Sequence, residues 1–550
     1  MAQLMAEYYP MKTSTLEPQS ENLLTVARSA QETLNVANLV STGWQVPSSR
    51  RLFVPIVMAL VLCICAYHLI GSGLGYNDYR DQHLGTALEF AKNRINLLRP
   101  VIVGFNANNE PTPQELPVWQ ALTAVLFKMF GIWFGWANVA SLLFFACGLW
   151  PLFQLARNYL GESGAWWALL FYCAQPLVFM MAGQGGTDIS CEVFAICFLY
   201  FADGLVRTGR WIWWIPAFIF GGLAAVTKLP FLFCTGVASF FLLLLHGRKS
   251  VRRWLQLGSI GLVTLLVFLI WTRYCNACIA RAEFPFTDLR VSKGSGMATW
   301  YFGTWSYNLN PWNWIKGGWR LFNAVFGSYV LAALPLWSLI SSRDRLGRLW
   351  LASAVLTTFV FTHLVLIHIH YYLMFTPPVA LLSAQAAMRL EEIFGFRQSQ
   401  QRGPMLLAIM VFLLAATGQG LVAMNTVLIT DPGSARIAGL IREHTQADDK
   451  LLIQGGGWGG EQLILSGRKG LTIWDTKFLE DPTALARIKE LGYTKLVMVS
   501  ETPLHHAVQF SKPGQIHIQR DTYDKHLTPV VQDWKVILQN DDLIIKEVPR

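Results

Sequence analysis

The sequence predicts a mainly α-helical, polytopic membrane helix bundle with a small α/β domain at its C-terminal end. Hydrophobic residues make up 53% of the chain and charged residues only 14%, well below the roughly 25% charged residues of ordinary soluble domains. Apolar runs of about 20 residues, long enough to cross a lipid bilayer, recur before Asp431. After Asp431, helix and strand patterns alternate, which predicts the terminal domain.

The apolar runs predict about eleven spans. They lie at residues 53–71, 136–156, 165–183, 189–206, 211–227, 231–246, 254–274, 321–340, 349–368, 371–388 and 405–424. Lys and Arg in the short loops fall on one side when these spans alternate, and that bias marks the cytoplasmic side. We therefore expect a multi-pass protein of the cell inner (plasma) membrane, with a cytoplasmic N-terminus and an extracytoplasmic C-terminal domain. The run 116–134 is either a further span or a re-entrant piece.

Three parts are predicted along the chain. Residues 1–50 form a cytoplasmic tail, 51–428 form the membrane module with outer loops at 72–117 and 276–318, and 429–550 form the α/β domain. In the first outer loop, apolar residues at helical spacing predict a helix over 81–93 that lies at the membrane interface. The second outer loop is rich in aromatic residues, including Trp300 and Trp305. These form either an interfacial belt or a platform for a sugar ring or a lipid chain.

Within the terminal domain, the patterns predict a parallel sheet core closed by a hairpin. Helices are expected at 433–444, 461–465 and 483–491, and strands at 450–454, 471–474, 495–499, 534–538 and 543–547. The Gly-rich stretch 455–460, with Asp475 after it, has the spacing of a dinucleotide-binding turn. Because this unit is small and is expected outside the cell, a structural or glycan-contacting turn is favoured.

The net charge of +10 does not indicate a nucleic-acid partner. The excess of basic residues lies before Asp431. Most of these residues belong to the predicted cytoplasmic loops, and part of them can contact the phosphates of membrane lipids. All nine cysteines lie in or beside predicted spans, so no disulfide framework is expected. Cys275 and Cys278 form a lone CxxC, for which a structural role is favoured over a redox or metal role.

Four ionisable residues stand at the outer ends of predicted spans. Asp81 follows the first span, and Lys228 interrupts a later one just before Pro230. Asp188 and Glu192 open another span, one helical turn apart. Charges at membrane depth cost roughly 2.5 to 3.5 kcal/mol each on insertion scales, so they usually line a polar cavity. A structural salt bridge is the alternative, but so many charges on one side favour an active site.

Outer-side histidines leave a divalent metal ion open as a cofactor, although none is certain. His363 and His370 share a helix face, seven residues apart. Their spacing is not diagnostic of a metal site, and a histidine satisfied by hydrogen bonds is the commoner outcome. The weak candidates for metal ligands are Asp81, His83 and His368.

These residues resemble motifs of the membrane glycosyltransferases of the GT-C class. The resemblance is to the group with the protein O-mannosyltransferases and the lipid A aminoarabinose transferase (glycosyltransferase family 39-like), over about residues 53–424. It is carried by Tyr79-Arg80-Asp81-Gln82, the PQELPVWQ stretch from Pro113, Thr187-Asp188, Ala225-Val226-Thr227-Lys228-Leu229-Pro230, and His370-Tyr371-Tyr372 to Pro377.

Two departures from the family pattern leave the donor sugar and the acceptor open. The family's usual Asp-Glu is Asp81-Gln82 in this chain. Glu115-Leu116-Pro117 stands where the aminoarabinose branch has Lys-Pro-Pro-Leu.

The resemblance implies transfer of a sugar from a polyprenyl-phosphate donor to a protein, lipid or glycan acceptor. Inverting transfer needs one base and cations for the departing phosphate, rather than two flanking carboxylic acids. Asp81 is the implied base, with Asp78 as its rival. The implied phosphate-binding residues are Lys228, Arg80, Arg99, His370 and Tyr371. The implied sugar- or acceptor-binding residues are Glu115, Asp188, Glu192, Trp300 and Trp305.

Two other classes of function stay open. A transporter or flippase of a lipid-linked or anionic solute would use buried charges as an ion relay near the membrane midplane. The charges here cluster at outer ends instead, which favours the enzyme. A non-catalytic scaffold would depend on the terminal domain and would not depend on Asp81.

Overall fold

The computed structural model describes residues 48–70, 78–105, 110–184, 186–281, 296–341, 345–394, 402–423, 432–454, 460–473, 482–499, 528–540 and 543–549. Contacts divide the chain into two units, Met1–Leu52 and Phe53–Arg550. Of the first unit, only the start of one helix is described. The second unit contains the apolar helices and the terminal sheet, so it carries the fold and the candidate site.

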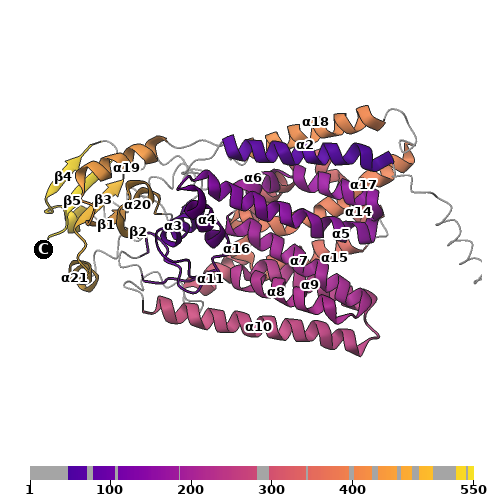
Figure 1. Ribbon diagram of the computed structural model, residues 1–550, viewed down its shortest axis with the longest axis horizontal. Coiled ribbons are helices and arrows are strands. Elements are labelled where there is room, and N and C mark those ends of the chain that lie inside the picture. Colours follow the sequence, from indigo (N-terminus) through magenta and orange to yellow (C-terminus); the bar gives the residue numbers. More distant parts are fainter. Residues whose placement is uncertain are drawn as a thin grey trace, which may run out of the picture. The chain divides into compact units, whose positions relative to one another are not determined.

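Apolar helices make up most of the second unit (Figure 1). Their bounds are α2 (Ser48–Ile70), α5 (Gly135–Ala174), α6 (Pro176–Gln184), α7 (Thr187–Thr208), α8 (Trp214–Thr227), α9 (Leu229–His246), α10 (Val251–Ile279), α14 (Tyr329–Ser341), α15 (Leu346–Val360), α16 (Thr362–Ile367), α17 (Thr376–Ile393) and α18 (Arg402–Ala423). Within the described ranges, five helices are long and apolar enough to cross a membrane, or six if a bent pair counts as one span. The mainly helical fold class is confirmed, whereas the number of eleven spans is not.

Several predicted spans are divided differently in the structure. The predicted spans 136–156 and 165–183 share the long α5, which breaks at Gly161 with φ of 72°, and α6 completes the second. The run 116–134 contains α4 (Val118–Phe130), whose 13 residues reach only about 20 Å, short of the roughly 30 Å hydrocarbon core. Lys228 separates α8 from α9 as predicted, because Pro230 in the first turn of α9 supplies no N–H to continue α8.

The outer segments add short helices around the ends of these spans. The first outer loop holds α3 (Asp78–Lys92), close to the predicted 81–93. Its buried residues Leu84 and Ala87 pack with Trp119 of α4, and Ile464 of the terminal domain packs against the same cluster. The α3 helix is therefore enclosed by protein on this face. Among the described residues, the second outer loop and the segment just after it contain the short helices α11 (Gly296–Phe302), α12 (Trp305–Asn308) and α13 (Pro311–Leu321) and the π-turn η2 (Phe322–Phe326).

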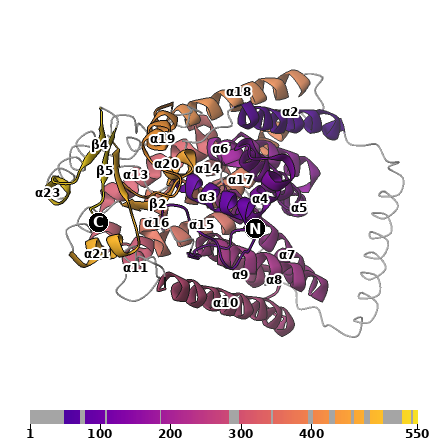
Figure 2. The same cartoon turned by 60° about the vertical axis from the view of Figure 1, so that its left-hand side comes forward.

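The terminal domain is built on a five-stranded sheet with the order β2-β1-β3-β5-β4. Its paired strands β4 and β5 can be followed in Figure 2. The strands are β1 (Lys450–Gln454), β2 (Lys469–Ile473), β3 (Lys495–Val499), β4 (Val536–Gln539) and β5 (Leu543–Glu547), and the helices are α19 (Pro432–His444), α20 (Glu461–Ser466), α21 (Pro482–Glu490) and α23 (Thr528–Val531). β1 pairs in parallel with β2 and β3, and β4 and β5 form an antiparallel pair. The predicted parallel core and closing hairpin are therefore present.

The first outer loop is joined to the edge of this sheet. Gly104 forms an isolated parallel bridge with Leu471 of β2, and the Thr472 N–H donates to the Gly104 carbonyl over 2.7 Å. Gly104 has φ of 92°, and a side chain there would meet the Thr472 hydroxyl. The loop that carries α3 and the sheet of the terminal domain therefore share backbone hydrogen bonding.

Candidate active site

Lys228 is a buried cation at the break between α8 and α9. Its backbone is extended, and the residue is only 4% exposed. The Nζ atom lies 2.7 Å from Asp188 Oδ1 and 3.4 Å from Glu115 Oε1, and it stands over the Tyr371 ring, 5.0 Å from the centroid. A buried charge without partners is very costly, so these carboxylates keep Lys228 charged and oriented. We call Lys228, Asp188, Glu115, His83 and His370 the outer charge cluster, after the side of the membrane on which the sequence predicts them.

The two carboxylates differ in their access to solvent. The Asp188 side chain, in the first turn of α7, is 3% exposed, whereas that of Glu115 is 20% exposed. The region around Lys228 is therefore closed on the α7 side and partly open on the Glu115 side. An incoming polar molecule would meet Glu115 before it reached Lys228.

Glu115 lies in a short bend, residues 114–116, which we call the strap and which is pinned on both sides. The Leu116 N–H donates to the Val226 carbonyl over 2.9 Å. The Trp271 Nε1–H donates to the Gln114 carbonyl over 3.3 Å. Val226 and Trp271 also pack in one buried apolar cluster with Leu116 against it. These contacts tie the strap to α8 and α10 and so fix the carboxylate beside Lys228.

His83 of α3 approaches the open side of Glu115. Its Nε2 lies 3.7 Å from Glu115 Oε2, and Gln120 Nε2 lies 2.6 Å from its Nδ1. Because the Gln120 amide nitrogen can only donate, the ring hydrogen belongs on Nε2, facing the carboxylate. Burial and, to a smaller extent, the positive charge of Lys228 lower the pKa of His83 to about 3, while Asp188 opposes the shift. His83 is therefore neutral at physiological pH.

A row of aromatic rings leads from the second outer loop to Lys228. Trp300 lies against His368 with 5.2 Å between ring centroids, and His368 stacks on His370 at 5.1 Å. His370 Nε2 lies 3.9 Å from Asp188 Oδ1, and its ring contacts that of Tyr371. These residues belong to α11, to the end of α16 and to η3 (Ile369–Phe375). Tyr371 thus lies beside the outer charge cluster, and Trp300 is linked to His370 through His368.

Glu192 lies one turn below Asp188 on α7 but has different partners. The Thr376 hydroxyl donates to its Oε1 over 2.8 Å, and Tyr172 forms a further side-chain hydrogen bond with it. The neighbouring Gln175 amide donates to the Thr376 carbonyl. Glu192 is therefore held by neutral hydroxyl groups, and no ion pair joins it to Lys228 among the side chains that the structure describes.

Other predicted site residues lie apart from this cluster or beyond what is described. Trp305 is 82% exposed, and Arg99 is exposed in the loop after α3. Asp78, Arg80 and Asp81 lie in the first turn of α3, but their side chains lie outside the described residues.

The residues of the metal, dinucleotide and CxxC hypotheses are described only in part. Among the described residues, no group of three or more His, Cys, Asp or Glu side chains could hold a metal ion. Most of the Gly-rich stretch, 455–459, and Asp475 lie outside the described residues. Cys275 and Cys278 are both free thiols, and Cys275 lies against the strap at the Gln114 carbonyl.

Sequence reasoning assigned no role to the residues that hold the cluster in place, although Gln120 and Thr376 lie within motifs that it singled out. Gln120, Trp271 and Thr376 position His83, the strap and Glu192, respectively. Tyr301 was placed only among the aromatic residues of the second outer loop, and burial raises its pKa to about 12 with a smaller contribution from the Glu115 charge. The available signal was the occurrence of a polar side chain, such as Gln120 or Thr376, in an otherwise apolar run.

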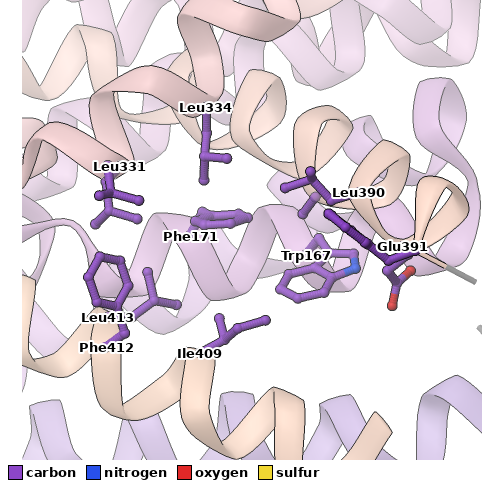
Figure 3. Close-up of a pocket in the computed structure, with 12 residues that line it drawn as sticks. Trp167, Phe171, Leu331, Leu334, Leu390, Glu391, Ile409, Phe412 and Leu413 are labelled. Atoms are coloured by element: carbon purple, nitrogen blue, oxygen red, sulfur yellow. The ribbon is translucent and has the colours of Figure 1, made fainter. Parts of the chain in front are cut away.

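A separate cavity of about 250 Å³ lies among α5, α14, α17 and α18 (Figure 3). Trp167, Phe171 and Leu413 are among its mainly apolar lining residues, and Glu391 is the charged one. It shares no residue with the outer charge cluster. Its mainly apolar lining suits an apolar ligand group, and the residues that line it do not form a catalytic arrangement.

Comparison with known proteins shows which family model and which solved structures this chain resembles. Residues 110–271, which include Glu115, Asp188 and Lys228, match the family model for dolichyl-phosphate-mannose-protein mannosyltransferase. The crystal structure of ArnT from Cupriavidus metallidurans in the apo state is 15% identical, with a TM-score of 0.59 over 90% of this chain and 98% of that chain. This chain has the GT-C fold. The predicted resemblance to GT-C glycosyltransferases is thereby confirmed.

Two further GT-C structures are similar. The ArnT structure from the same organism bound to undecaprenyl phosphate is 14% identical, with a TM-score of 0.58 and the same coverage of both chains. The apo oligosaccharyltransferase from Archaeoglobus fulgidus is 12% identical over 88% of this chain and 73% of that chain, with a TM-score of 0.48. No curated protein matches the sequence significantly.

Proposed function

We propose that this GT-C protein is an inverting glycosyltransferase that moves a sugar from a polyprenyl-phosphate donor to a hydroxyl or similar acceptor on the outer face of the membrane. The observation that carries the proposal is the buried Lys228 at a helix break, 2.7 Å from Asp188 and beside the partly open Glu115. The similar ArnT crystal structure contains undecaprenyl phosphate, which supports a lipid phosphate as ligand.

Lys228 is the proposed cation for the donor phosphate. In the absence of donor, Asp188 and Glu115 neutralise it, and a phosphate entering from the Glu115 side would take over part of that pairing. As the bond between the sugar C1 and the phosphate oxygen breaks, negative charge grows on the polyprenyl phosphate that leaves. A fixed ammonium group stabilises that charge without having to reorganise. His370 and Tyr371 flank the same position.

Asp81 is the proposed base for the acceptor hydroxyl, with Asp78 as the rival. Asp81 precedes His83 by two residues on α3, and His83 reaches Glu115 over 3.7 Å. The first turn of α3 is thus tied to the same region as Lys228. The acceptor oxygen would lose its proton to the carboxylate as it attacks C1 from the side opposite the phosphate, which inverts the anomeric centre. Glu115 and Asp188 are proposed to bind sugar or acceptor hydroxyls.

The location of the charges supports an enzyme rather than a transporter. Asp188 lies in the first turn of α7, Lys228 lies between two helices, and Glu115 lies in a loop. Charges at helix ends suit a reaction at the membrane surface, whereas an ion relay places charges along the spans.

Mass spectrometry of lipids that copurify with the full-length protein tests the proposal. The expected result is a polyprenyl phosphate or its sugar-linked form, followed by sugar transfer when the protein is reconstituted with that donor and an outer-face acceptor. Repeated absence of such a lipid, or movement of a solute across proteoliposomes without a glycosidic product, would overturn it.

A further inference from the structure

The α13 helix turns a mixed apolar and basic face outward. Trp312, Ile315 and Trp319 are all more than half exposed, and Lys316 is exposed between them. Together with Arg320 they line a hollow of about 340 Å³. Exposed tryptophans in such numbers are typical of a surface that meets lipid headgroups.

The opposite face of α13 is fixed against the protein. The Asn313 amide donates to the Tyr307 carbonyl over 3.0 Å, and the Trp314 Nε1–H donates to the Asn308 carbonyl over 2.7 Å. Gly317 is buried, and a side chain there would collide with Leu366 of α16. Because these contacts set the rotation of the helix, the outward direction of the tryptophans and Lys316 is a built feature of the fold.

A sharp bend sets the direction of α13. The segment Pro311–Phe326 meets α14 at 97°. The bend occurs at Gly327, which has φ of 62° and leaves no room for a side chain beside the Ala416 carbonyl. Since α14 packs along the apolar α17, a perpendicular α13 lies close to the plane of the membrane surface rather than across it.

The charge of this region favours an anion. The sequence from Gly296 to Ser341 contains no Asp or Glu, and Lys316 and Arg320 are its two basic residues. Arg320 donates to the Leu366 carbonyl over 2.9 Å, so part of its guanidinium is already engaged. Lys316 is therefore the cation that faces outward, between aromatic side chains that can cover a glycerol backbone and the start of the acyl chains.

We propose that α13 is an interfacial helix that seats an anionic phospholipid, with the lipid phosphate at Lys316 and the lipid body against Trp312 and Trp319. The site is distinct from the outer charge cluster and does not depend on the proposed function. Arg320 connects the two, because it holds the carbonyl groups of Leu366 and Ile367 just before His368 and His370.

Native mass spectrometry of the full-length protein tests this site. Purified protein is titrated with phosphatidylglycerol or with phosphatidylcholine of the same acyl chains. Wild type is expected to retain at least one phosphatidylglycerol preferentially, and Lys316→Gln to weaken that retention about fivefold, as expected for one basic residue near a headgroup. Trp319→Ala is expected to weaken the retention of both lipids, because it removes apolar contact rather than charge.

Lys249→Gln serves as the matched control, since Lys249 is an exposed lysine in the turn between α9 and α10. It should leave the preferential retention unchanged. Equal retention of the two lipids by wild type, an equal effect of Lys249→Gln, or loss of the preferred lipid in Lys228→Met but not in Lys316→Gln would each overturn the proposal. Displacement by millimolar inorganic phosphate would also overturn it, since it would show a site for free anions.

Discussion

The two ends of α7 each bury a carboxylate, but they surround it differently. At one end, Asp188 faces the buried ammonium of Lys228 at a helix break, next to the partly open Glu115. At the other, Asp203 accepts hydrogen bonds from Tyr159 over 2.5 Å and Asn158 over 3.5 Å. Its ionic partner, Arg207, lies 3.8 Å away with a side chain that is 40% exposed.

We interpret the difference as one between a proposed functional charge and a structural one. Asp203 is satisfied by neutral groups and by a solvated Arg one turn away, so its contacts hold α5 against α7. The outer cluster buries a cation in a break of the backbone and leaves one of its acids open to solvent. A stabilising contact needs neither feature, whereas a site that binds and releases an anion needs both.

The largest expected effect concerns the base. Asp81→Asn should reduce sugar transfer by a factor of about 100 to 10,000, since the amide cannot take the acceptor proton. Asp78→Asn is the matched control three residues away and should retain most of the activity. Initial rates with labelled donor measure both, and a greater loss in Asp78→Asn would move the base to that residue.

Replacing the buried cation should have the next largest effect. Lys228→Met should lower transfer by about 100- to 1,000-fold, because the departing phosphate loses its fixed positive charge. The double variant Lys228→Met/Asp188→Asn keeps Asp188 from being left as an unpaired buried charge and should be as inactive but better folded. Asp203→Asn, at the other end of α7, should transfer sugar at nearly the wild-type rate. A severe loss of activity in folded Asp203→Asn would contradict the division between the two ends.

A smaller effect is expected where the strap is pinned. Trp271→Phe keeps an aromatic side chain but removes the indole N–H that donates to the Gln114 carbonyl, so Glu115 should become less well positioned. A neutral hydrogen bond contributes about 0.5 to 1.5 kcal/mol, so transfer should fall about two- to tenfold. Steady-state kinetics check this, and unchanged kinetics would show that the strap holds its position without Trp271.

The smallest effect is a pH dependence of stability. His83 has a pKa of about 3 in the folded protein, against about 6.5 when unfolded. Between these values the unfolded state binds more protons, so the contribution of His83 to stability is complete above about pH 6.5 and declines as the pH falls toward 3. His83→Gln should flatten this decline in thermal unfolding measured from pH 7 to pH 5. An identical decline in the variant would assign it to other groups.

In the terminal domain, sequence patterns predicted the bounds of several strands. β1, β3 and β5 begin and end at the predicted residues, because each is a short apolar run bounded by polar or turn residues. The helix break at Lys228 could also be predicted from the sequence, since Pro230 cannot continue α8. In contrast, apolar composition alone could not show that the predicted span 321–340 turns through 97° near Gly327.

The partners within the site could be predicted only in part. Lys228 and Asp188 were expected to line the same polar cavity, because both stand at the predicted outer ends of spans, and a salt bridge between them was the alternative. Glu192 was grouped with them from its i,i+4 spacing, yet one turn of helix moved it to Thr376 and Tyr172. That step is about 6 Å along the helix axis, enough to change every neighbour in a packed interior. Sequence spacing gives the face of a helix, but the facing side chains come from elements distant in the chain.

The most direct test of the central claim compares lipids bound to three purified proteins. Mass spectrometry should find a polyprenyl phosphate, with or without its sugar, on wild type and on Asp203→Asn, and should find it depleted on Lys228→Met. Retention of the lipid phosphate by folded Lys228→Met at the wild-type level would contradict the claim that the buried cation between α8 and α9 binds the donor phosphate.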